Sequence, residues 1–123
     1  MNALVIDDSR VVRSILRHML GELGFQVQEA SNGREGIDAL GRGSAPDVVF
    51  VDWNMPVMNG LEFVCAVRSD ASRAELPLVM VTTESEMESV SKALEVGASE
   101  YIMKPFDRDI VREKLQILGI AVV

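Results

Sequence analysis

Five short apolar runs, separated by stretches with helical periodicity, constrain the fold of this chain more than any other feature. They are ALVI from Ala3, VVFV from Val48, LVMV from Leu78, YIM from Tyr101 and a weaker run, Phe25 to Val27. Runs that are apolar throughout, rather than alternating, are typical of parallel strands covered on both faces. Between the runs, apolar residues recur at three- and four-residue steps, most clearly from Val11 to Leu23, which predicts amphipathic helices. We therefore expect an α/β domain of alternating strands and helices.

The punctuation of the chain agrees with this alternation. Strands are predicted near residues 2–6, 25–30, 47–52, 77–82 and 100–103, each followed by a helix. Gly24 and Gly97 fall where left-handed caps would end the first and fourth helices. Ser85 and Glu88 have the spacing of a capping box for the fourth helix, and Asp107 can cap the fifth. No linker or repeat interrupts the series, so residues 1–123 are predicted to form one domain.

Size, cysteine content and charge exclude several classes of protein. A chain of 123 residues can bury about two-thirds of its unfolded surface, and the single cysteine, Cys65, rules out an internal disulfide. We expect Cys65 to pack as a small apolar side chain. The sequence has no signal peptide and nothing close to the roughly 18 apolar residues of a membrane helix, which predicts a soluble, cytoplasmic protein. The net charge of −7 disfavours direct nucleic-acid binding.

Polar side chains follow four of the five predicted strands. Asp7 and Asp8 end the first strand, Asp52 the third, Thr82 the fourth, and Lys104 the fifth. Ligands of open parallel sheets bind outside the carboxyl ends of the strands, where the strand order reverses. These residues are far apart in the sequence, yet the fold would bring them to one rim.

Such a group of charges requires a cation. Two carboxylates about 4 Å apart repel by about 4 kcal/mol at an effective dielectric constant near 20, and here three would face one lysine. The ligands are hard oxygens and are too few for an all-protein calcium site, which favours magnesium that keeps several waters. A carboxylate nucleophile, a magnesium ion, a lysine and a hydroxyl together indicate phosphoryl transfer.

Four segments resemble, in order, the motifs of the response-regulator receiver domain. They are VIDDSR from Val5, VDWNMPVMNG from Val51, VTTE from Val81 and YIMKPF from Tyr101. The similarity covers the whole chain and is greatest to the single-domain chemotaxis regulators of the CheY type. It implies a flavodoxin-like (βα)5 fold: a doubly wound, five-stranded parallel sheet of order 2-1-3-4-5 with helices on both faces.

The resemblance also implies a role for each residue of the rim. Asp52 would be phosphorylated by a partner histidine kinase. Asp8 and Asp52 would ligate magnesium directly, together with the backbone carbonyl of Asn54, while Asp7 would act through a metal-bound water. Lys104 would hold a phosphoryl oxygen.

A switch is implied as well. On phosphorylation Thr82 would move toward the phosphoryl group and Tyr101 would swing inward, while Lys104–Pro105 would be a cis peptide bond that aims the lysine. The face of the fourth helix, fifth strand and fifth helix would then change its preference for partners. Thr83 departs from the family, because a smaller residue is usual there.

Two further features concern the lifetime of the signal and the end of the chain. In this family the side chains of Asn54 and Glu84 would flank the acyl phosphate and tune its hydrolysis. Here they match the chemotaxis regulators, which predicts a short-lived phosphate. The closing segment GIAVV, from Gly119, is expected either to pack on the sheet edge or to fray.

The leading hypothesis is a stand-alone, monomeric response regulator that acts as a phosphoacceptor switch rather than as an enzyme. Its output partner would be a motor component, a phosphotransfer protein or an enzyme, in chemotaxis or another pathway. A phosphorelay intermediate and a receiver segment of a larger regulator stay open, although Met1 just before the first strand favours a complete small protein. A magnesium phosphohydrolase with an aspartyl-phosphate intermediate would need a second acid where Asn54 stands. Nucleotide or flavin binding would need a glycine-rich loop after the first strand.

Overall fold

One parallel sheet of five strands forms the centre of the computed structural model, which describes residues 1–122 apart from the side chain of Glu84. The sheet order is β2-β1-β3-β4-β5, as predicted. Each strand begins within one residue of its predicted start. The strands are β1 (Asn2–Ile6), β2 (Gln26–Ala30), β3 (Val48–Asp52), β4 (Leu78–Thr82) and β5 (Glu100–Met103).

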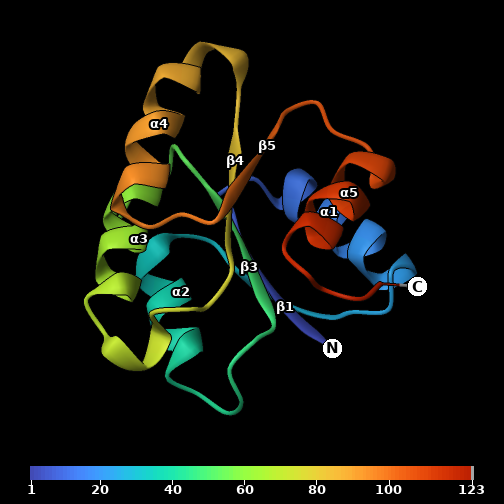
Figure 1. Cartoon of the computed structure of the whole chain (residues 1–123), viewed down its shortest axis with the longest axis horizontal. Coiled ribbons are helices and arrows are strands. Elements are labelled where there is room, and N and C mark those ends of the chain that lie inside the picture. The colour runs from blue at the N-terminus through green and yellow to red at the C-terminus, as the bar shows by residue number, and fades with distance from the viewer. Residues whose placement is uncertain (123) are drawn as a thin grey trace.

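Helices cover both faces of this sheet (Figure 1). On one face lie α2 (Gly33–Leu40), α3 (Gly60–Arg68) and α4 (Met87–Val96), and on the other α1 (Arg10–Glu22) and α5 (Arg108–Ile117). Short 3-10 turns at Ala71–Arg73 and Glu84–Glu86 precede β4 and α4. Within residues 1–122, no helix is both long and apolar enough to cross a lipid bilayer. The predicted flavodoxin-like α/β arrangement is confirmed.

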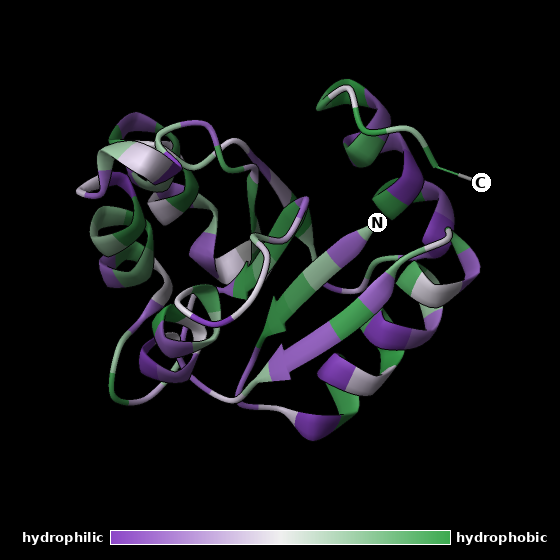
Figure 2. Cartoon of the chain, turned by 90° about the horizontal axis from the view of Figure 1, so that it is seen from below, coloured by the Kyte–Doolittle hydropathy of each residue, from purple (hydrophilic) through white to green (hydrophobic). Residues whose placement is uncertain are grey.

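The core consists of one apolar layer on each side of the sheet. Phe63 of α3 packs with Leu4 and Met80 in one layer, while Leu16 of α1 and Leu115 of α5 pack in the other. In the ribbon coloured by hydropathy, hydrophobic residues fill most of the central strands, and hydrophilic and hydrophobic residues alternate along the helices (Figure 2). All residues of β3 and β4 are buried, as expected for strands covered on both faces. Burial of each Leu or Phe side chain in these two layers stabilises the fold by about 1.5–3 kcal/mol.

Two helix ends confirm the glycine caps. Gly24 follows α1 with a φ of 97°, and the backbone N–H of the buried Phe25 donates to the carbonyl of Leu20 over 3.0 Å. Gly97 ends α4 with a φ of 126°. At α5, Asp107 accepts a hydrogen bond from the N–H of Ile110 at 2.9 Å, as predicted.

The predicted capping box at Ser85 and Glu88 is wrong. The chain between β4 and α4 first makes the 3-10 turn, and α4 starts only at Met87. The bonds that start this segment belong to a different pair, because the N–H of Thr83 donates to Glu86 Oε1 over 2.9 Å. Thr83 and Glu86 have the same three-residue spacing that suggested the other pair.

Cys65 was also predicted wrongly, since its side chain is exposed. The buried side of α3 consists of Gly60, Phe63, Val64 and Val67, which repeat at helical spacing, and Cys65 is off that stripe. The segment after α5 packs rather than frays up to residue 122. Its side chains at positions 120 and 122 contact the layer beneath α1 and α5.

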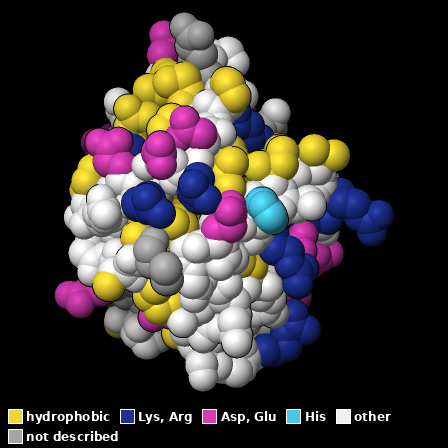
Figure 3. All heavy atoms as spheres, turned by 90° about the vertical axis from the view of Figure 1, so that its right-hand side faces the viewer, with side chains coloured by type: hydrophobic (Ala, Val, Ile, Leu, Met, Phe, Trp, Pro, Cys, Tyr) yellow, Lys and Arg dark blue, Asp and Glu magenta, His cyan; other side chains and the backbone are white. Residues whose placement is uncertain are grey.

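The side of the molecule formed by α1 and α5 mixes acidic, basic and apolar groups on its surface (Figure 3). On α1, Val11 is 68% exposed and Ile15 is half exposed. His18, on the same helix, has a largely exposed side chain that lies 3.7 Å from Glu22. This histidine therefore lies outside the core.

Arg68 ties together three segments at the end of the sheet opposite the aspartates. Its guanidinium donates to the carbonyl oxygens of Gly97 at 2.9 Å, Arg73 at 2.7 Å and Leu76 at 2.7 Å. Burial lowers the pKa of Arg68 from its ordinary value. The last residue of α3 thereby fixes the carboxyl end of α4 and the approach to β4.

Candidate functional site

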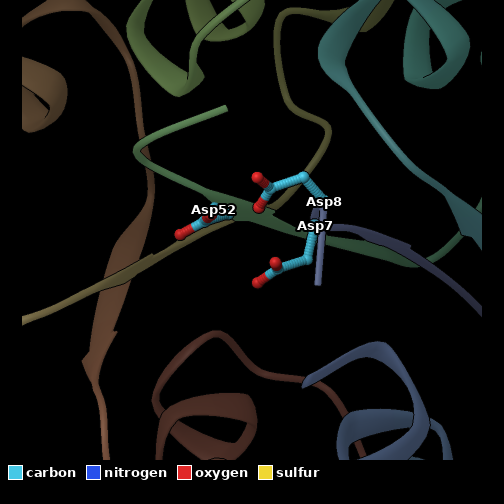
Figure 4. A group of neighbouring side chains, drawn as sticks. All are labelled: Asp7, Asp8 and Asp52. Atoms are coloured by element: carbon cyan, nitrogen blue, oxygen red, sulfur yellow. The ribbon is translucent and has the colours of Figure 1, made fainter. Parts of the chain in front are cut away.

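Three aspartates meet at the carboxyl ends of the central strands. Asp7 and Asp8 follow β1, Asp52 ends β3, and one carboxylate oxygen of each lies within 4.8 Å of the others (Figure 4). The pairing of β1 with β3, with Ile6 opposite Val51, brings these two strand ends together. Asp7 and Asp52 are buried, at 1% and 5% exposure, and Asp8 is exposed.

Lys104 completes this group from the end of β5. Its Nζ lies 3.2 Å from Asp52 Oδ1 and 3.4 Å from Asp7 Oδ2. Its backbone N–H donates to the carbonyl of Thr82 at 2.7 Å, and the following peptide bond to Pro105 is cis. Burial alone would lower the pKa of Lys104, but the charges of Asp52 and Asp7 raise it above its ordinary value. The ammonium is thus the counter-charge of two buried carboxylates.

The positive charge of one lysine does not neutralise the negative charge of the three aspartates. Burial, and then the charge of Asp7, raises the pKa of Asp52 to about 6, against the smaller opposing effect of Lys104. Burial also raises the pKa of Asp7, although its Oδ1 accepts a hydrogen bond from the N–H of Ser9 at 2.8 Å. Asp7 Oδ2 is buried and, apart from its ion pair with Lys104, accepts no hydrogen bond among residues 1–122. The site thus has more carboxylate oxygens than its one positive charge can neutralise, and a divalent cation would fit it.

Asn54 lies in the turn that follows β3, two residues after Asp52. Asn54 is exposed, and Met55 turns into the core. The turn closes where the N–H of Gly60 donates to the carbonyl of Trp53 at 2.9 Å. A Cβ on residue 60 would lie only 2.6 Å from the carbonyl oxygen of Asp52. The turn is compact because position 60 has no side chain.

Thr82 ends β4, the strand beside Asp52, and is 1% exposed. Its hydroxyl lies 3.3 Å from the carbonyl of Thr83 and 3.4 Å from Glu86 Oε1. The Thr83 hydroxyl also donates to Glu86 Oε1, at 3.0 Å. The hydroxyl expected to face a phosphoryl group is thus engaged with the segment that leads into α4.

Tyr101 lies near the amino end of β5, opposite Met80 of β4, and is half-buried. The Lys114 ammonium sits 4.7 Å from the centre of its ring and forms an ion pair with Glu100 at 3.1 Å. Tyr101 is therefore not part of the charged rim.

The structure brings four predicted residues into direct contact or close to it, namely Asp7, Asp8, Asp52 and Lys104. The predicted role of the Glu84 side chain lies outside the described residues. The interpretation of the sequence missed Glu86, which contacts Thr82 and Thr83. The Thr-x-x-Glu spacing from Thr83 was the available signal.

Known proteins match this chain closely. The family model of the response regulator receiver domain matches residues 3–116. Chemotaxis protein CheY1 of Helicobacter pylori is 42% identical over 119 residues, which are 96% of each chain. The chemotaxis protein CheY homolog of Campylobacter jejuni is 43% identical over 121 residues, 97% of this chain and 93% of its own.

A solved structure agrees with the sequence comparisons. The chemotaxis response regulator CheY4 of Vibrio cholerae superimposes with a TM-score of 0.87 at 36% identity, over 95% of this chain and 97% of its own. Sequence and fold are therefore similar over almost the full length of the chain. The chain belongs to the response regulator receiver domain family and is similar to the chemotaxis regulators of the CheY type.

Proposed function

We propose that this protein is a phosphoacceptor switch in which Asp52 receives a phosphoryl group from a histidine kinase. One observation carries the proposal: the buried Asp52 carboxylate lies 3.2 Å from the Lys104 ammonium and shares its site with Asp7 and Asp8. A structural ion pair needs only one carboxylate for one lysine. Three carboxylates beside one lysine, at the ends of parallel strands, are instead suited to binding a cation together with an anionic group.

The side chains divide the work of phosphoryl transfer. An ionised oxygen of Asp52 attacks the phosphorus, the bond from phosphorus to the donor nitrogen breaks, and its electron pair stays on that nitrogen. Lys104 favours the ionised form of Asp52 and then donates to a phosphoryl oxygen. Asp8, Asp52 and the backbone carbonyl of Asn54 would ligate magnesium directly, and Asp7 would do so through water. Bound magnesium would supply the positive charge that this transfer needs.

The output that we propose is protein binding through the face of α4, β5 and α5. Thr82 would reach the phosphoryl group, Tyr101 would move inward, and this face would change shape. The relatives named as chemotaxis proteins support chemotaxis as the pathway. A motor component is the partner that we propose for that pathway. We expect a cytoplasmic monomer whose phosphate lifetime depends on Asn54 and Glu84. A phosphotransfer protein or an enzyme as the partner, and a place in a larger regulator, are the remaining proposals.

Fluorescence of Trp53 tests the proposal directly. Trp53 is the only tryptophan, follows Asp52 and packs half-buried against the core. Magnesium, and then beryllofluoride or a small phosphodonor, should change its emission, and mass spectrometry should find one added phosphate. Asp52→Asn should abolish the response to the phosphodonor.

Two results would contradict the proposal. A wild-type protein that neither responds to magnesium nor takes up phosphate would exclude a phosphoacceptor. Steady turnover of a phosphomonoester, far beyond one phosphate per chain, would identify a phosphohydrolase instead. That activity is not expected, because Asn54 stands where such an enzyme needs an acid.

A further inference from the structure

The carboxylate of Glu86 holds the loop between β4 and α4 in one arrangement. Its Oε1 accepts hydrogen bonds from the Thr83 N–H at 2.9 Å and from the Thr83 hydroxyl at 3.0 Å. The same oxygen lies 3.4 Å from the hydroxyl of Thr82. Thr82 at the rim and Thr83 in the loop thus share one carboxylate oxygen.

The hydroxyl of Thr82 has few alternatives in this arrangement. Thr82 is 1% exposed, so bulk water does not replace a lost partner. Its single proton can be donated to the carbonyl of Thr83 at 3.3 Å or to Glu86. Both acceptors belong to the segment that follows Thr82 in the sequence and leads into α4. A phosphoryl group on Asp52 would have to compete with them for this proton.

Glu86 is also the residue just before α4. It occupies the cap position of that helix, yet its own side chain makes no hydrogen bond that caps the first turn of α4. The bonds of Glu86 therefore fix the loop to β4 rather than stabilise the helix end. Breaking them would free Thr82 and the start of α4 together.

We propose that Glu86 is a positioning residue that holds Thr82 in the resting arrangement, and that its release sets how readily phosphorylation moves α4. This inference rests on the proposed function, because it concerns the switch that follows phosphorylation of Asp52. Thr83 is part of the same device, since both of its donors hold the carboxylate in place. The larger residue at position 83 thus supplies a hydrogen bond that a smaller apolar residue could not.

The test compares Glu86→Ala and Glu86→Gln with the wild type. Beryllofluoride is titrated in the presence of magnesium, and Trp53 emission reports the apparent affinity. Loss of a hydrogen bond that exists only in the resting state should raise this affinity by about fivefold in Glu86→Ala. Glu86→Gln should fall between Glu86→Ala and the wild type, because the amide oxygen still accepts hydrogen bonds but carries no charge.

Glu88→Gln is the matched control, because it removes the same charge from the first turn of the same helix. Its affinity should equal that of the wild type. Urea unfolding of each variant separates the proposal from simple damage. A merely structural role would lower both stability and beryllofluoride affinity, whereas release of Thr82 lowers stability and raises the affinity.

The outcomes are distinguishable. If the wild type responds to beryllofluoride and both Glu86 variants bind it equally or more weakly, this inference is overturned and the proposed function stands. If Glu86→Ala does not fold, Glu86→Gln decides: tighter binding than wild type supports the inference, and equal or weaker binding overturns it. If the wild type itself gives no response, the proposed function fails and takes this inference with it.

Discussion

Replacing Asp52 with asparagine should stabilise the metal-free protein at neutral pH. The wild-type fold holds this carboxylate at 5% exposure, with the buried Asp7 as a neighbour and only Lys104 as a counter-charge. Asparagine has nearly the same shape and no charge. The substitution therefore tests the electrostatic part of the site and leaves its packing almost unchanged.

The magnitude follows from the pKa of Asp52. In the folded state it is about 6, while an unfolded chain leaves it near the ordinary 3.8. Each pKa unit corresponds to about 1.4 kcal/mol, so the ionised carboxylate costs the fold about 3 kcal/mol. Because the raised pKa makes the folded state the tighter proton binder, this cost is absent at low pH. It grows as the pH rises from below 3.8 to above about 6.

The assay is urea unfolding without metal, followed by far-UV circular dichroism at about pH 4 and about pH 8. The advantage of Asp52→Asn over the wild type should grow by roughly 2–3 kcal/mol between these conditions. With a urea dependence of about 2 kcal/mol per molar, the midpoints at the higher pH should differ by about 1 M or more. Magnesium should then stabilise the wild type and leave Asp52→Asn nearly unchanged.

Asp38→Asn provides the control, because Asp38 is exposed on α2 and the chemical change is the same. It should change stability by less than about 0.5 kcal/mol at either pH. Equal midpoints for the wild type and Asp52→Asn at the higher pH would refute the reasoning. So would a gain in stability that does not depend on pH.

Three other substitutions and one control test the site, the turn beside it and the opposite end of the sheet. Lys104→Met should destabilise the metal-free protein by about 2–4 kcal/mol in urea unfolding, since it leaves Asp7 and Asp52 without their cation; magnesium should recover part of the loss. Gly60→Ala should lower stability by roughly 1–3 kcal/mol in thermal unfolding, because its Cβ would meet the Asp52 carbonyl at 2.6 Å. Gly21→Ala on α1, where nothing lies within 4 Å, should be neutral or stabilise by about 1 kcal/mol. Arg68→Met should cost about 2–4 kcal/mol and speed amide exchange around residue 97, because carbonyl oxygens lose their donors.

The strands and the rim could be predicted because their causes are local. An apolar run predicts a buried parallel strand, and Gly24 predicts a helix end through its own backbone preference. The gathering of Asp7, Asp52 and Lys104 then follows, because parallel strands place their carboxyl ends together. The charged residues could therefore be grouped from the order of strands and helices alone, without predicting each pairwise contact.

The details that were missed depend on competition between similar patterns or on distant partners. Both Thr83–Glu86 and Ser85–Glu88 have capping-box spacing, and only the 3-10 turn before α4 decides between them. Cys65 is apolar enough for the core, but it does not lie on the buried face of α3. Arg68 gave no signal at all, because its partners are backbone carbonyls, which every residue carries.

The anchoring of Arg68 has a mechanical consequence for α4. The helix is held at its carboxyl end through the carbonyl of Gly97, and the side chain of its cap residue, Glu86, does not cap its first turn. A tilt of α4 that keeps this bond would pivot near the carboxyl end of the helix. Residues of the first turn, nearest Thr82, then travel furthest, and those near Gly97 hardly move. Under the proposed function, a partner that binds the amino-terminal half of α4 would therefore respond to the state of Asp52, and one that binds only its last turn would bind both states alike.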